Sequence, residues 1–280
     1  MILVTGATGT VGSGVLTGLV EHGEQVRGVS RRPAGPAHGG VEWFAGDLSD
    51  AATLGGLADG ADAVFLVTSG EDGPNQARNV LARAEQAGVR QIVGLSALSV
   101  GHGAADPIST WHRAAEETLQ AGPIPWCILR PGGFMSNTLA WADSIRHAGS
   151  VYAPFADGRT AVIDPGDISA CAVSCLLEPG HAGQAYELTG PESLSIGEQV
   201  KIIGKVIGRE LADVEVPPEA ARQAMVDAGM PPAAADAVLG TLEAARSDFA
   251  GTVTGTVPEI TGRPATSFED WVSAHQASFR

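Results

Sequence analysis

Three evenly spaced glycines near the amino terminus are the residues best suited to binding a nucleotide. Gly6, Gly9 and Gly12 follow a short apolar run, Ile2–Thr5, and open a helix predicted over Val11–Glu21. In such a strand–turn–helix the first glycine permits the tight turn, the second lets backbone approach a pyrophosphate, and the third lets helix and strand pack closely. The helix N-terminus presents unpaired N–H groups to the anion. The spacing predicts dinucleotide binding rather than a merely structural turn.

The end of the second predicted strand, Gln25–Val29, indicates which dinucleotide binds. An acidic side chain there would bind the free ribose 2′-hydroxyl of NAD, whereas arginine accommodates the 2′-phosphate of NADP. The chain carries Arg31 and Arg32 at this place, with no acid beside them. Two guanidiniums in an otherwise acidic chain suit a phosphate dianion. We therefore expect NADP, the alternative being that both arginines are solvated surface residues.

The overall composition excludes several classes of protein. With 280 residues, 44% hydrophobic and 18% charged, the chain can bury a core and is not disordered. Its formal net charge of −15 disfavours binding to nucleic acid or to an anionic membrane. The three cysteines and seven histidines show no metal-ligand spacing, so no metal is expected. We find no targeting signal and expect a cytoplasmic protein.

Short apolar runs alternate with helix-like stretches in the first two-thirds of the chain. Candidate strands are Ile2–Thr5, Gln25–Val29, Val41–Ala45, Ala63–Val67, Gln91–Leu95 and Trp126–Leu129. Candidate helices are Val11–Glu21, Ala51–Leu57, Asn75–Gln86 and Thr110–Gln120. The strands are apolar on both faces, as expected when helices cover both sides of a parallel sheet. The pattern predicts an α/β fold with a Rossmann-type doubly wound parallel sheet.

The remainder of the chain predicts a smaller, mainly helical C-terminal substrate lobe. We expect a nucleotide-binding domain over 1–150, with segments near 160–190 returning to it, and the substrate or lid lobe over 151–280. Asp167 is a plausible N-cap for an Ala/Cys/Leu helix. An Ala-rich helical hairpin over 217–249 could form a lid or a homodimer contact. Further elements are expected at Ser136–His147 (helix), Gln184–Leu188 (strand), Ile196–Ile207 (helix) and Ser267–Phe279 (helix).

Several motifs together resemble one protein superfamily. They are the glycine triplet, Gly46-Asp47-Leu48-Ser49 after the third strand, His112-x-x-x-Glu116, and the segment Leu129–Asn137 with its Arg-Pro-Gly-Gly. With them the chain resembles the atypical short-chain dehydrogenases/reductases. More narrowly, it is similar to the NmrA-like group that includes NADPH:quinone oxidoreductases. The resemblance covers about residues 1–210 by motif.

The resemblance implies a cofactor site made of residues that follow the predicted strands. Thr8, Gly9, Thr10 and Val11 would lie along the pyrophosphate, and Asp47 and Leu48 at the adenine. Thr68, Ser69, Ser96 and Ala97 would line the nicotinamide half, and Pro131, Gly132, Gly133 and Phe134 would lie beside its ring. The same placement is expected physically, because ligands of open α/β sheets bind beyond the carboxyl ends of the strands.

The chain departs from the superfamily at the usual general acid, a Tyr-x-x-x-Lys pair. Its only tyrosines, Tyr152 and Tyr186, are not followed by lysine four residues later, and no lysine precedes Lys201. By motif alignment Ile108 and His112 stand at the tyrosine and lysine positions. Reduction of an ordinary ketone, whose alkoxide needs a strong proton donor, is therefore disfavoured.

A quinone or related conjugated carbonyl remains a suitable acceptor, because hydride addition gives a delocalised and weakly basic anion. His112 is the candidate for proton delivery; it could instead contact the cofactor ribose or cap a helix. Met135, Asn137, Trp141 and Phe155 are candidates to line a pocket for a small planar conjugated substrate. The function predicted is an NADPH-dependent oxidoreductase. Two alternatives are a non-catalytic NADP(H)-sensing regulator and a tailoring enzyme of aromatic polyketide biosynthesis.

Overall fold

The structure is a computed structural model and describes residues 1–32 and 40–280. Its contacts divide the chain into two compact units, each made of three segments. The first unit comprises Met1–Pro131, Pro165–Leu188 and Thr256–Arg263, and the second comprises Gly132–Asp164, Thr189–Gly255 and Pro264–Arg280. The first change of unit therefore falls after Pro131, whereas the sequence places a domain boundary at residue 150.

The first unit is built on a seven-stranded parallel sheet, which confirms the predicted Rossmann-type fold. The strand order is β3-β2-β1-β4-β5-β6-β9. The strands are β1 (Ile2–Val4), β2 (Val26–Ser30), β3 (Val41–Ala45), β4 (Ala63–Val67), β5 (Gln91–Leu95), β6 (Trp126–Pro131) and β9 (Ala185–Leu188). β1 pairs with β2 on one side and β4 on the other, so the order reverses there. Ligands of doubly wound sheets bind beyond the carboxyl ends of the strands at such a reversal.

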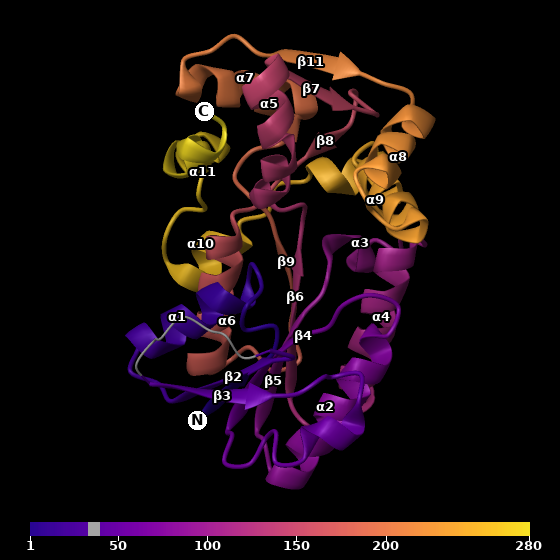
Figure 1. Ribbon diagram of the computed structural model, residues 1–280. Coiled ribbons are helices and arrows are strands. Elements are labelled where there is room, and N and C mark those ends of the chain that lie inside the picture. The colour runs from indigo at the N-terminus through magenta and orange to yellow at the C-terminus, as the bar shows by residue number, and fades with distance from the viewer. Residues whose placement is uncertain (33–39) are drawn as a thin grey trace. The chain divides into compact units, whose positions relative to one another are not determined.

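Helices cover both faces of this sheet, as its doubly apolar strands require. Helices α1 (Gly12–Glu21) and α6 (Pro165–Leu177) lie together on one face, and α2 (Gly73–Ala87) and α4 (Pro107–Ala121) on the other (Figure 1). A short helix α3 (Leu98–Gly101) follows β5, and α10 (Thr256–Thr261) packs on α6 and β9. α2 begins after Asp72 with a proline in its first turn and ends at Gly88 in the left-handed conformation, a common pair of helix end signals.

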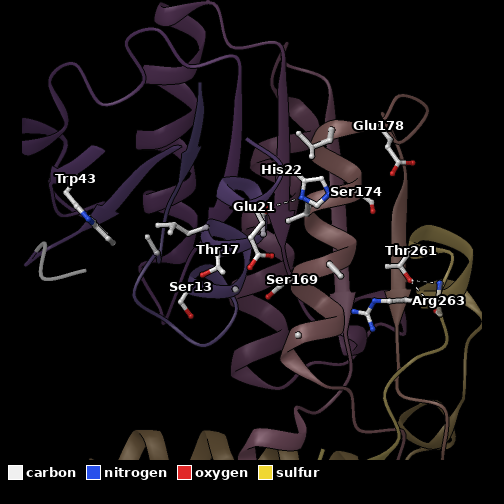
Figure 2. Close-up of a pocket in the computed structure, with 18 residues that line it drawn as sticks. Ser13, Thr17, Glu21, His22, Trp43, Ser169, Ser174, Glu178, Thr261 and Arg263 are labelled. Atoms are coloured by element: carbon white, nitrogen blue, oxygen red, sulfur yellow. Dashed lines mark hydrogen bonds between the residues drawn. The ribbon is translucent and has the colours of Figure 1, made fainter. Parts of the chain in front are cut away.

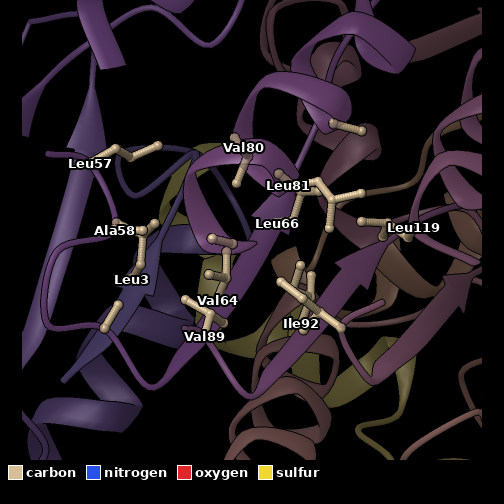
Figure 3. Packing of buried hydrophobic residues seen from close by; sticks show 14 of the residues in the cluster. Leu3, Leu57, Ala58, Val64, Leu66, Val80, Leu81, Val89, Ile92 and Leu119 are labelled. Carbon is tan, nitrogen blue, oxygen red and sulfur yellow. The ribbon is translucent and has the colours of Figure 1, made fainter. Parts of the chain in front are cut away.

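The main core of the first unit lies between the sheet and the α2–α4 layer. Aliphatic side chains from strands and helices interlock there, among them Leu3, Val64, Val80 and Leu119, all almost fully buried (Figure 3). Burying such a side chain contributes about 1.5–3 kcal/mol relative to exposing it. This layer holds the strands in register, so the loops at their carboxyl ends have a rigid base.

The second unit is mainly helical and has its own core. Its helices are η2 (Met135–Trp141), α5 (Ala142–Ala148), α7 (Ile196–Ile207), α8 (Pro218–Asp227), α9 (Pro232–Ala244), η3 (Asp248–Gly251), α11 (Phe268–His275) and η4 (Gln276–Ser278). Two small sheets pair β7 (Ser150–Ala153) with β11 (Ala212–Glu215) and β8 (Arg159–Thr160) with β10 (Leu194–Ser195). The aromatic residues Phe268, Trp271 and Phe279 are buried at its centre.

Some predicted elements differ in the structure for identifiable reasons. The helix expected over Ala51–Leu57 is only a 3-10 turn, η1 (Ala51–Leu54), because Gly55 is extended and Gly56 has a positive φ of 74°. Asp167 does not cap α6. That helix begins at Pro165, and Asp167 is buried in its first turn, paired with Arg263 at 2.8 Å.

Candidate functional site

The opening turn has a geometry that favours glycine at two positions. Gly6 has φ +59°, and its carbonyl oxygen accepts the N–H of Gly9 at 2.8 Å. A Cβ atom on Gly12 would lie 2.2 Å from that same oxygen, too close for any side chain. The turn therefore brings the start of α1 directly against the end of β1.

The N-terminus of α1 is open to solvent, which fits an anionic ligand. Among the described residues no side chain caps it, and its first turn contains no acid. Thr8, Gly9 and Thr10 are exposed, while Val11 and Gly12 are buried beneath them. The end of a helix carries a partial positive charge and N–H donors, so the pyrophosphate of a dinucleotide fits this turn. The backbone N–H groups of this turn are those predicted to hold the pyrophosphate.

The ends of β2 and β3 present the residues predicted for the adenosine half. Arg31 and Arg32 follow β2 and are exposed. Asp47 folds a tight loop after β3, because its carboxylate accepts the N–H of Ser49 at 3.0 Å. The carbonyl of Leu48 accepts the side-chain amide of Asn79 at 2.9 Å, which ties this loop to α2. These residues stand in one row beside the glycine turn, as the strand order β3-β2-β1 requires.

The ends of β4 and β5 continue this row on the other side of β1. Thr68 and Ser96 are buried, whereas Ser69 is exposed and Ala97 half-buried. The N–H of Ser69 donates to the side-chain oxygen of Gln76 at 3.0 Å. The N–H of Ser96 donates to the carbonyl of Leu129 at 2.7 Å. Pro131, the last residue of β6, is also buried.

A buried ion pair lies behind the ends of β5 and β6. Glu116 on α4 is 5% exposed and accepts from Arg130, with Nε at 2.9 Å and Nη2 at 2.5 Å. The same carboxylate accepts the hydroxyl of Ser96 at 2.5 Å. These hydrogen bonds raise the pKa of Arg130. The sequence indicated Glu116 only as part of a family motif. It did not predict the ion pair with Arg130, which lies 14 residues further along the chain.

His112 lies one turn before Glu116 on α4. Burial lowers the pKa of its imidazole, while the negative charges of Glu116 and Asp106 act in the opposite direction. Asp106 caps α4, its carboxylate accepting the N–H of Ser109 at 3.0 Å. The two positions of the missing acid pair, Ile108 and His112, are both on this helix.

The residues predicted after Pro131 all belong to the second unit. Gly132 and Phe134 are half-buried and Gly133 is exposed, with the Gly133 carbonyl accepting the N–H of Ile163 at 2.8 Å. Met135 is 1% exposed and packs in the core of that unit, with Trp141 against it. Asn137 is exposed.

Phe155, the last predicted substrate residue, is the one residue other than glycine with a positive φ, +59°, among residues 1–32 and 40–280. Its ring faces the guanidinium of Arg246 at 6.0 Å. Arg246 also pairs with Asp157 at 3.1 Å. Backbone strain of this kind is held in place by the surrounding contacts and is often found at ligand sites.

A cavity of about 760 Å³ lies elsewhere in the first unit, along α1 and α6 (Figure 2). The two helices approach closely because Gly14 and Gly18 face Ser169 and Val173. Trp43, His22 and Arg263 line its margins. None of the predicted site residues lines this groove.

Two kinds of feature are missing from the described parts of the chain. Over residues 1–32 and 40–280, no cluster of three or more His, Cys, Asp or Glu side chains could hold a metal ion. In those same ranges, every helix is too short or too polar to cross a membrane.

Comparison with known proteins identifies relatives that match this chain over almost its full length. The chain is 43% identical to a (4-alkanoyl-5-oxo-2,5-dihydrofuran-3-yl)methyl phosphate reductase of Streptomyces griseus subsp. griseus, over 100% of this chain and 99% of the relative. It is 38% identical to an NAD(P)H azoreductase of Xenophilus azovorans, with the same coverage.

Among solved structures, the NADPH-dependent quinone oxidoreductase QOR2 of Escherichia coli, complexed with NADPH, superimposes with a TM-score of 0.88. The two chains share 27% sequence identity, over 98% of this chain and 99% of that one. This neighbour confirms the resemblance inferred from the motifs. Residues 6–179, from the first glycine to just beyond α6, match the NAD(P)H-binding family. The chain belongs to the NAD(P)H-binding family.

Proposed function

We propose that this protein is an NADPH-dependent reductase of small conjugated acceptors, such as quinones and activated conjugated carbonyls. One observation carries the proposal: an intact nucleotide turn stands in the same unit as an α4 helix that has Ile108 and His112 where a tyrosine and a lysine would form the acid. The chain is thus equipped to hold the cofactor and poorly equipped to protonate an alkoxide. NADPH, when bound, supplies a hydride.

The relatives share an acceptor chemistry that fits this site. The dihydrofuranone named for the Streptomyces relative has a carbon–carbon double bond conjugated to two carbonyl groups, and the other names specify azo and quinone acceptors. In each case the negative charge produced by hydride addition can spread onto nitrogen or a remote oxygen. Such an anion needs only a weak acid, so His112 or water suffices for protonation. Positioning of cofactor and acceptor would then provide most of the rate.

Arg31 and Arg32 support NADPH as the cofactor used. They follow β2 at the place where the 2′-substituent of the ribose lies in this fold. Their exposure leaves both guanidiniums accessible to a phosphate dianion. We also propose that Asn137, Trp141 and Phe155 contact the acceptor, as predicted from the sequence. Met135, predicted with them, is buried in the core of the second unit and is left out of this proposal.

Turnover tests this function directly. The purified protein is mixed with NADPH and, separately, a quinone, a 2-acyl butenolide, an azo dye, a simple ketone and a simple aldehyde, and loss of NADPH absorbance is followed. We expect consumption with one or more conjugated acceptors and none with the simple carbonyl compounds. Equal rates with a simple ketone would contradict the argument from the missing acid pair. Tight NADPH binding without consumption in any mixture would favour a non-catalytic NADP(H) sensor.

The location and assembly of the protein remain predictions. We propose a cytoplasmic protein, as expected in the sequence analysis. The helical pair α8 and α9 is proposed as either a lid or a homodimer contact. Light scattering of the purified protein, with and without NADPH, distinguishes a dimer from a monomer.

A further inference from the structure

A small cavity lies between the sheet and α4, just below the ends of β4 and β5. Its volume is about 10 Å³, close to the space needed for one water molecule. Four polar side chains reach it: Thr68, Ser96, His112 and Glu116. The rest of the lining is apolar, made of Leu66, Gly94, Leu95, Ala115, Leu119 and Ile128.

Two of the four polar groups are fixed by hydrogen bonds. Arg130 contacts both oxygens of Glu116, and Ser96 donates to one of them. The carboxyl group is therefore held in one orientation. Buried waters occupy polar cavities of this size when they find two to four hydrogen-bonding partners, and this cavity offers four.

We propose that this cavity holds one ordered water, and that Glu116 acts through it as a positioning residue for His112. The water accepts or donates at the imidazole and donates to the Glu116 carboxylate, linking the ring to the Ser96–Glu116–Arg130 network. This role rests on the proposed function, in which His112 passes a proton to the acceptor anion and takes up one proton from solvent in each turnover.

The charges around the ring agree with this role. On α4 itself, Asp106 and Glu116 favour the protonated imidazole, and burial opposes it. On the sheet side the nearby cation is Arg130. Its guanidinium donates to both oxygens of Glu116, so its positive charge is paired with that carboxyl group. A water that solvates the imidazolium would reduce the cost of charging this half-buried ring.

The water can be tested without measuring turnover. First, a high-resolution crystal structure of the wild-type protein should show an ordered water within hydrogen-bonding distance of Glu116 and His112. Second, Ala115→Val adds methyl groups to the cavity lining and leaves its four polar side chains unchanged. Ala114→Val is the matched control, because Ala114 is the neighbouring residue of the same helix and does not line the cavity.

The readout is the pKa of His112, followed by NMR titration of its ring nitrogens. We expect Ala115→Val to lower that pKa by about 0.5 to 1, and the pH profile of turnover to move by the same amount, whereas Ala114→Val changes neither. If Ala115→Val does not fold, Thr68→Val removes one hydroxyl partner of the water without adding volume, and the same fall is expected.

Two results would overturn the proposal. One is the absence of an ordered water from the wild-type cavity, and the other is an unchanged pKa of His112 in every folded variant with an altered cavity. Neither measurement depends on catalysis. If the wild-type protein consumes no NADPH with any acceptor, the proposed function fails, while the crystal structure and the titration still decide whether this water positions His112.

Discussion

Replacing Gly12 by alanine should remove most of the affinity for NADPH. A Cβ atom there would lie 2.2 Å from the carbonyl oxygen of Gly6 and 2.7 Å from its carbonyl carbon. Real Cβ atoms essentially never come closer than 3.0 Å, so the oxygen would have to retreat by roughly 0.8 Å. That oxygen also accepts the N–H of Gly9, so the whole turn has to move with it.

The size of the effect follows from the hydrogen bonds that the turn can make. A hydrogen bond to a charged group contributes about 1.5–3 kcal/mol. Losing one such bond to the pyrophosphate raises the Kd for NADPH by roughly 10- to 150-fold, since about 1.4 kcal/mol corresponds to a factor of ten. The crowded backbone would also lower the free energy of unfolding by about 1–3 kcal/mol.

Calorimetric titration with NADPH and urea unfolding measure the two effects separately. Gly55→Ala is the matched control, because Gly55 has φ −61° and a Cβ atom there would have no neighbour within 4 Å. This control should leave stability within about 0.5 kcal/mol of the wild type and affinity unchanged. A folded Gly12→Ala protein that binds NADPH as tightly as Gly55→Ala would refute the assignment of the turn as the pyrophosphate site.

Three further outcomes are expected. Arg31→Asp should raise the Kd for NADPH roughly 10- to 150-fold and leave that for NADH nearly unchanged, so equal losses in parallel titrations would contradict a 2′-phosphate contact. Burial raises the pKa of Cys171 to about 12, so this thiol stays protonated well above neutral pH and iodoacetamide should label it only after denaturation; labelling of the folded protein, detected by mass spectrometry, would show that the site opens. Arg263→Ala removes the 2.8 Å ion pair with buried Asp167 and should lower the free energy of unfolding by about 1.5–3 kcal/mol in urea, whereas no change would mean that the pair contributes nothing.

The strands of the first unit could be predicted closely, because their signal is local. Val41–Ala45, Ala63–Val67 and Gln91–Leu95 have the same bounds in the structure as in the sequence prediction. Each is a short run of mostly apolar residues with turn residues beside it, a pattern that depends on no distant partner. The two-residue strands β8 and β10 carry no such pattern and exist only because they pair with each other.

The part of the candidate site that is formed by backbone groups could be predicted from the sequence. The glycine turn could be derived from spacing alone, since Gly6 and Gly12 are demanded by the turn itself. The buried network could not, because the contact of Glu116 with Arg130 depends on α4 packing behind β6. An i, i+4 pair of histidine and glutamate on one helix face was the only local sign of it.

The buried charges explain why this site suits a conjugated acceptor. Both oxygens of Glu116 accept hydrogen bonds from Arg130, so this side chain is already engaged in the ion pair. Burial lowers the pKa of His112, which disfavours the protonated ring that an alkoxide would demand. A quinone or an activated double bond avoids this demand, because hydride addition gives a delocalised, weakly basic anion that water can protonate. The same residues that pack behind β5 and β6 thus fit the proposed reduction of acceptors that delocalise charge.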